Sequence, residues 1–313
     1  MNQLAGEPPG RITPLDEIVN IFEFELMAKR KLPAAIFSTI AGGNRADLEL
    51  VTFRPHLMVD TTKLNLTTEL FGLSMFAPIL AGPASDQRKI HPEGELAMVR
   101  GASVAKAVTV IGSLSSYPIE KIVAEAKGPL WYQVYAEAPE NEARSQAQQA
   151  LNLGCKALMI TVRTPGKLDW SGIDRLRKSL TAPVLLKGLI GNADAENAVK
   201  RGIQGIVLSN SGMESPPSPF ATLPSIVDAV GGRIPVLIDG GFRRGTDILK
   251  ALILGAEAVL ITRPLLWGLA AYGGDGVRAA MEMMQTELAR NMVMIGAATP
   301  KALTRNMIKF HKR

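Results

Sequence analysis

The feature of this chain that most constrains its fold is a regular alternation of short apolar runs with helix-like segments. Within each run apolar and polar residues do not alternate. Continuous apolar runs of this length are typical of parallel strands buried on both faces. The runs span residues 77–83, 107–113, 130–135, 157–162, 183–188, 205–210, 235–240 and 258–263. The helix-like segments between and after them span residues 92–105, 118–126, 141–153, 171–180, 193–201, 223–230 and 245–254.

This spacing predicts a parallel α/β architecture, and eight units in roughly 190 residues favour a closed TIM (β/α)8 barrel. An open doubly wound sheet is disfavoured because its first turn is expected to carry a GxGxxG pattern, whereas the first turn here reads Gly82-Pro83-Ala84-Ser85. We expect one structural domain with three parts. Residues 1–76 form an N-terminal helical and β-rich arm, residues 77–273 form the barrel, and residues 274–313 form two helices, over 277–292 and 300–311, that pack on it.

Composition narrows the class of protein. The chain has 313 residues, 47% of them hydrophobic, which suffices for one large core. No apolar stretch approaches the ~20 residues of a membrane span, and the N-terminus lacks the order of a signal peptide. These observations predict a cytoplasmic protein without membrane association.

Charge and metal-ligand chemistry exclude two further classes. The net charge of +6 comes from 35 basic and 29 acidic residues in a chain poor in aromatic residues, so we expect no nucleic-acid partner. The one cysteine, Cys155, is expected to be a buried core thiol. None of the three histidines follows a predicted strand, so we expect no metal site.

Glycine and arginine follow two successive predicted strands. Asp239-Gly240-Gly241 leads into Arg243, and the next strand ends in Thr262-Arg263. Glycines let backbone N–H groups approach an anion, the following helix offers its N-terminal end, and guanidinium groups donate paired hydrogen bonds. A tight strand-to-helix turn explains each junction alone. Their paired placement after strands seven and eight favours the phosphate site of a TIM barrel.

Motifs in a kept order extend this pattern over nearly the whole chain. They are Leu32-Pro33, Phe53-Arg54-Pro55, His91-Pro92-Glu93-Gly94-Glu95, Gln133-Val134-Tyr135, Leu186-Lys187-Gly188, Ser209-Asn210, the Asp239–Asp247 stretch and Arg263-Pro264. The chain thereby resembles the FMN-dependent α-hydroxy acid dehydrogenase/oxidase family, which includes glycolate oxidase and lactate oxidase. The resemblance implies FMN as cofactor and a small-molecule substrate, and it leaves room for a homo-oligomer.

The resemblance also implies roles for particular residues. Gly241, Arg243 and Arg263 would hold the phosphate. Lys187 would lie beside the flavin N1–C2=O edge and, with Tyr135, act in catalysis. The remaining implied cofactor contacts are Ser85, Ser113, Gln133, Thr161, Ser209, Asp239, Gly240 and Thr262.

Departures from the family pattern gather at the substrate end. Ser211 stands where the family has its catalytic histidine, and Glu214 stands where it has a substrate arginine. Arg163 replaces the aspartate that orients that histidine, and the loop that follows is too short for the family's lid. Thr39 and Ile40 replace a tyrosine pair. Because an unassisted serine is a poor general base, oxidation of simple 2-hydroxy acids is expected to be impaired.

Three functions remain open on this basis. The first is a flavin oxidoreductase with an altered substrate site or route, a non-redox FMN enzyme of the isopentenyl-diphosphate isomerase kind included. The second is a barrel that binds FMN or phosphate without catalysis, and the third is slow α-hydroxy acid oxidation on Tyr135 and Lys187. The opposite charge changes at Arg163 and Glu214 predict an ion pair between them.

Overall fold

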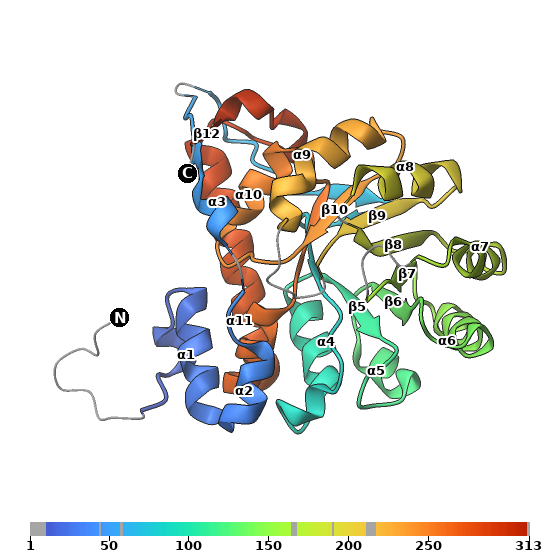
Figure 1. The fold of residues 1–313 in the computed structure, drawn as a ribbon. Coiled ribbons are helices and arrows are strands. Elements are labelled where there is room, and N and C mark those ends of the chain that lie inside the picture. Colours follow the sequence, from blue (N-terminus) through green and yellow to red (C-terminus); the bar gives the residue numbers. More distant parts are fainter. Residues whose placement is uncertain are drawn as a thin grey trace.

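The computed structural model describes residues 11–43, 45–56, 59–163, 168–189, 191–210 and 217–311. Parallel strands close into a barrel in the order β10-β11-β4-β5-β6-β7-β8-β9, which confirms the predicted (β/α)8 architecture (Figure 1). Every predicted apolar run overlaps one of these strands, and only β8 extends beyond its run, by one residue. The bounds are β4 Ile79–Ala81, β5 Val108–Gly112, β6 Leu130–Tyr135, β7 Leu158–Thr161, β8 Val184–Leu189, β9 Gly205–Leu208, β10 Val236–Asp239 and β11 Ala258–Ile261.

Alternate residues of each strand point into the barrel and out toward the helices. The interior is filled by side chains such as Trp131, Met159 and Leu185, which belong to one buried cluster. Their sequence neighbours Tyr132, Ile160 and Leu186 belong to the cluster beneath the surrounding helices. This two-residue period fixes which residues beyond the strand ends face the barrel axis.

The helices around the barrel occupy the predicted segments. Their bounds are α4 Gly94–Val104, α5 Ile119–Glu125, α6 Glu140–Asn152, α7 Trp170–Lys178, α8 Asn192–Lys200, α9 Pro219–Val230 and α10 Gly245–Ile253. A 3-10 turn, η2 Gln87–Lys89, precedes α4. Cys155 is buried as expected, and burial raises the pKa of its thiol to about 11. Among the described helices, none is both long and apolar enough to cross a membrane.

The N-terminal arm lies beside the last helix of the chain. It comprises η1 Leu15–Glu17, α1 Ile21–Lys31, α2 Ala34–Ile40 and α3 Ala46–Glu49. α1 packs along α11 Arg263–Met294, which is interrupted by non-helical backbone at Tyr272 and Gly273 (Figure 1). A hairpin of β2 Thr68–Leu70 and β3 Leu73–Met75 contributes Leu70 and Met75 to the barrel interior.

The expected C-terminal helix over residues 300–311 is wrong. That segment forms two 3-10 turns, η3 Pro300–Ala302 and η4 Arg305–Met307, followed by the strand β12 Ile308–Phe310. β12 pairs antiparallel with β1 Val51–Phe53 of the arm. A helix prediction rests on local pattern alone, and here a strand partner from the other end of the chain supplies the backbone hydrogen bonds instead.

Candidate active site

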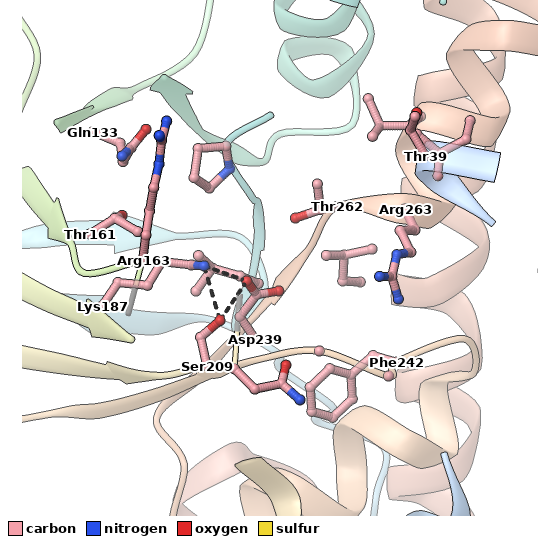
Figure 2. Close-up of a pocket in the computed structure, with 18 of the residues that line it drawn as sticks. Thr39, Gln133, Thr161, Arg163, Lys187, Ser209, Asp239, Phe242, Thr262 and Arg263 are labelled. Carbon is pink, nitrogen blue, oxygen red and sulfur yellow. Dashed lines mark hydrogen bonds and ion pairs between the residues drawn. The ribbon is translucent and has the colours of Figure 1, made fainter. Parts of the chain in front are cut away.

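A cavity of about 480 Å³ opens at the carboxyl ends of the barrel strands (Figure 2). It is lined by Thr39, Ile40, Pro83, Gln133, Tyr135, Thr161, Arg163, Lys187, Ser209, Asn210, Asp239, Gly240, Gly241, Phe242, Arg243, Leu260, Ile261, Thr262, Arg263 and Leu266. All but two of the predicted cofactor residues are therefore gathered here, together with Tyr135 and Arg163. The carboxyl end of the strands is where TIM barrels place their active sites.

Strand alternation explains which predicted residues face the cavity. Tyr135 pairs in register with Thr161, and Thr161 pairs with Lys187, so three polar side chains lie side by side on neighbouring strands. Each is an even number of residues beyond an interior side chain such as Trp131 or Met159. Arg163 continues the same parity beyond β7.

The two remaining cofactor candidates lie elsewhere. Ser113 is an odd number of residues beyond the interior Val110 and lines a separate hollow with Ser115 and Tyr117. Ser85 is not among the described lining residues. Ser211 and Glu214 fall outside the described residues, and so does the predicted contact between Glu214 and Arg163.

Lys187 and Asp239 form an ion pair in the floor of the cavity. The Lys187 Nζ atom lies 2.8 Å from Asp239 Oδ2, and Nζ donates to Ser209 Oγ at 3.1 Å (Figure 2). The Lys187 and Asp239 side chains are 8% and 16% exposed. Such burial leaves the pair little screening by water.

Two arginines form the opposite end of the cavity. Arg243 is buried, and its guanidinium lies 4.6 Å from the centroid of the Trp267 ring. Burial, and secondly the neighbouring Arg263, lower the pKa of Arg243 to about 10. Two cations held together in this way favour an anion between or beside them.

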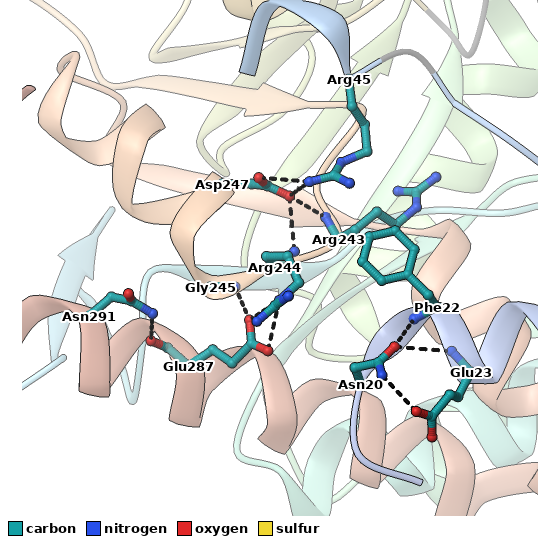
Figure 3. A network of polar contacts seen from close by, with 10 residues as sticks. All are labelled: Asn20, Phe22, Glu23, Arg45, Arg243, Arg244, Gly245, Asp247, Glu287 and Asn291. Carbon is teal, nitrogen blue, oxygen red and sulfur yellow. Dashed lines mark hydrogen bonds and ion pairs between the residues drawn. The ribbon is translucent and has the colours of Figure 1, made fainter. Parts of the chain in front are cut away.

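The start of α10 is not open to that anion, contrary to the sequence expectation (Figure 3). The backbone N–H groups of Arg243 and Arg244 donate to Asp247 Oδ2 at 2.9 and 3.0 Å, and that of Gly245 donates to Glu287 at 2.7 Å. The Arg244 guanidinium also pairs with Glu287, at 2.9 Å. An anion here would therefore bind to the Arg243 and Arg263 side chains and the glycines, because the carboxylates of Asp247 and of Glu287 in α11 already cap the start of α10.

Arg163 stands across the cavity from this arginine pair. Its guanidinium carbon lies 3.8 Å from the centroid of the Tyr135 ring, and its backbone N–H donates to Glu137 Oε1 at 2.7 Å. Figure 2 shows the side chain beside Gln133 and Thr161, away from Arg263. A guanidinium stacked by its face keeps its N–H edge available for a planar anion.

Two buried polar atoms in the lining have no partner among the described residues. They are Gln133 Nε2 and Thr161 Oγ1. An unsatisfied buried donor or hydroxyl costs about 1–3 kcal/mol, so both atoms point to a ligand with hydrogen-bonding groups.

Several lining residues had no clear signal in the sequence. Phe242, Leu260 and Leu266 are apolar residues of the kind found throughout the core, and nothing local marks them as facing a ligand. Among the described lining residues there is no histidine. His91 accepts a hydrogen bond from the backbone of Glu93 at the start of α4.

Comparison with known proteins identifies a consistent group of relatives. A sequence model of the family described as FMN-dependent dehydrogenase matches residues 28–167 and 163–310. The peroxisomal (S)-2-hydroxyacid oxidase GLO3 of Arabidopsis thaliana is 31% identical, over 94% of this chain and 97% of its own. Glycolate oxidase of Spinacia oleracea is 31% identical, over 93% and 96%. A crystal structure of mandelate oxidase with (S)-2-phenylpropionate superposes with a TM-score of 0.90, at 34% identity over 95% of this chain and 100% of that one.

The alignments also locate a difference in length. The match to the Arabidopsis oxidase runs over 353 positions, more than this chain's 313 residues, so the relative carries insertions. The family match divides into two pieces that overlap at residues 163–167. This is the loop that the sequence predicts to be too short for the family's lid. The expectation of a cytoplasmic protein is contradicted, because the Arabidopsis relative and one from Oryza sativa are named as peroxisomal.

The cavity fits the cofactor of these relatives. A phosphate suits the crowded guanidinium groups of Arg243 and Arg263, since its charge offsets the cost of burying them. The unpaired atoms of Gln133 and Thr161 would gain hydrogen-bond partners from the polar groups of a flavin bound in this cavity.

Proposed function

Since the chain belongs to the FMN-dependent dehydrogenase family, we propose that it is an FMN oxidoreductase with a substrate site unlike that of simple 2-hydroxy acid oxidases. Its cofactor is FMN, which when bound accepts an electron pair from the substrate. The observation that carries the proposal is the stack of Arg163 on Tyr135 inside a cavity whose described lining holds no imidazole.

The charge of the cavity supports an anionic substrate. Its described lining holds four cations, Arg163, Lys187, Arg243 and Arg263, against one carboxylate, Asp239. A phosphate monoester carries about −1.5 to −2 at neutral pH, which leaves roughly one positive charge over. Because Lys187 is paired with Asp239, that excess lies on Arg163.

The residues divide the work accordingly. Arg163 would orient the charged group of the substrate through its N–H edge, and the Tyr135 hydroxyl would donate to a substrate oxygen. Lys187 would hold a positive charge beside the cofactor where negative charge develops, as the resemblance implies. Ser211 is a poor general base compared with the histidine that the family has at this position. The proton of the substrate would therefore pass to solvent, to another group of the substrate or to another residue of the 211–216 segment.

Anaerobic mixing of the FMN-loaded protein with a panel of hydroxy acids tests this function. The rate at which glycolate and L-lactate bleach the flavin should be lower, by a factor on the order of 10²–10⁴, than in a protein with a histidine base. The matched variant Ser211→His should recover part of that factor. Rapid bleaching of the unaltered protein by either acid would contradict the proposal.

A second function, an FMN-binding barrel without catalysis, is favoured by the same lack of an imidazole in the described lining. An ion pair of Arg163 with Glu214 would support it, because the pair would neutralise the cation offered to substrate. A double-mutant cycle of Arg163→Ala and Glu214→Ala on stability measures that coupling. A coupling energy near zero would mean that Arg163 is available to bind substrate. A clear coupling energy, together with no flavin bleaching by any acid, would favour the FMN-binding barrel without catalysis.

A further inference from the structure

The N-terminal arm reaches the arginine end of the cavity through Gly42. The Gly42 carbonyl oxygen accepts a hydrogen bond from Arg243 Nη2 at 2.6 Å and another from Arg263 Nη1 at 3.3 Å. One backbone oxygen thus bridges two guanidinium groups that come from different barrel junctions. A carbonyl oxygen placed between two cations fixes their separation and offsets part of their repulsion.

The next residue packs directly on the same two groups. A Cβ atom added to Gly43 would lie 2.6 Å from Arg263 Nη1 and 2.7 Å from Arg243 Nη2. Its φ angle is +127°, which L side chains rarely adopt. The backbone of the arm therefore lies against both guanidinium groups with no room for a side chain between them.

The Gly42-Gly43 segment is itself anchored on both sides. The Gly42 N–H donates to Glu25 Oε1 of α1 at 3.0 Å. The Ile40 carbonyl accepts from Trp267 Nε1 of α11 at 2.9 Å, and Trp267 is the ring beneath the Arg243 guanidinium. Arm, last helix and arginines thus form one closed set of contacts.

We infer that the Gly42-Gly43 segment of the arm is part of the phosphate site, and that it positions Arg243 and Arg263 to bind the phosphate of FMN. Gly42 and Gly43 are positioning residues, because they act through the two arginines. The affinity for a flavin then depends on the Gly42-Gly43 segment only when the flavin carries a phosphate.

Comparison of FMN with riboflavin, which lacks the phosphate, tests this inference in the variant Gly43→Ala. We expect FMN affinity, measured by quenching of flavin fluorescence, to fall about tenfold or more, as for loss of one charge-assisted contact. Riboflavin affinity should stay within about twofold. Gly154→Ala is the matched control, because Gly154 has φ +101° and no atom within 4 Å of an added Cβ. It carries similar backbone strain away from the cavity and should change neither affinity.

A second measurement uses the unaltered protein, in case Gly43→Ala does not fold. FMN, and inorganic phosphate at high concentration, should slow hydrogen exchange of backbone amides in residues 34–43, and riboflavin should not. The inference would be overturned if Gly43→Ala lost equal affinity for FMN and for riboflavin, or if FMN left the hydrogen exchange of residues 34–43 unchanged. Absence of FMN binding by the unaltered protein would overturn the cofactor assignment as well, so the two failures are distinguishable.

Discussion

Replacement of Arg243 by methionine separates the cofactor role of this arginine from its structural role. Methionine keeps a long stem against Trp267 and removes the charge. In the protein without FMN, the charge is costly, since burial and Arg263 lower the pKa of Arg243 from 12.5 to about 10. At 1.36 kcal/mol per pKa unit, this penalty is roughly 3 kcal/mol.

The favourable contacts of the guanidinium oppose that penalty. Nη1 donates to the Phe242 carbonyl at 2.8 Å and Nη2 to the Gly42 carbonyl at 2.6 Å. Hydrogen bonds from a charged group contribute about 1.5–3 kcal/mol each. Relief of the buried charge offsets one or two such bonds, so Arg243→Met should lower the free energy of unfolding without FMN by only about 0–3 kcal/mol.

With FMN the balance changes, because the phosphate neutralises the charge and adds a charge-assisted contact. Its loss, about 1.5–3 kcal/mol, should weaken FMN binding by roughly 10- to 150-fold. Fluorescence titration with FMN and with riboflavin measures the effect. Arg244→Met is the matched control, since the Arg244 guanidinium pairs with Glu287 and is not part of the cavity lining. A shift below about threefold for FMN, or an equal shift for riboflavin, would refute this reasoning.

Three further outcomes test other parts of the site and the core. Lys187→Met should lower the reduction potential of bound FMN, because the reduced cofactor loses a cation, and an unchanged potential in a spectroelectrochemical titration would place Lys187 elsewhere. Thr161→Val should raise the free energy of unfolding without FMN by about 1–2 kcal/mol, because it removes a buried hydroxyl that lacks a partner, and it should weaken FMN binding. A denaturant titration that shows lower stability, or an FMN titration that shows unchanged or tighter binding, would contradict this. Burial raises the pKa of the Cys155 thiol to about 11, against 9.0 for an ordinary thiol, so the thiol should stay neutral in the folded protein at pH values where it ionises in the unfolded chain. This difference contributes roughly 2–3 kcal/mol to the free energy of unfolding below pH 9, and the contribution is lost as pH rises from 9 to 11. In Cys155→Ala the free energy of unfolding, measured by denaturant titration at each pH, should therefore fall less over that window.

The barrel was predictable because its signal is local. A parallel strand buried on both faces, such as Ala258–Ile261, has a continuous apolar sequence. The two basic strand ends were predictable for the same reason, since Arg243 and Arg263 directly follow the strands that position them.

Features that depend on distant partners could not be predicted. Ile308–Phe310 becomes a strand only because Val51–Phe53 lies beside it. Asp247 occupies the start of α10, and Arg45 of the arm holds it with Nη2 at 3.0 Å from each carboxylate oxygen (Figure 3). The contact of Gly42 with Arg243 joins residues about 200 positions apart, and glycine in an arm segment has no pattern that indicates such a partner.

The two ends of the cavity are built by different means, and this decides what family membership says about each. At the cofactor end, Arg243 and Arg263 are held by the arm, and Arg243 also stacks on Trp267, so several contacts fix their positions. At the substrate end, Arg163 begins the short segment where the family match divides, and its guanidinium stacks on the Tyr135 ring. A change of sign there alters which ligand is attracted without disturbing how the cofactor is held. Family membership therefore gives the cofactor of this protein, and we propose that the charge of Arg163 and its neighbours selects its substrate.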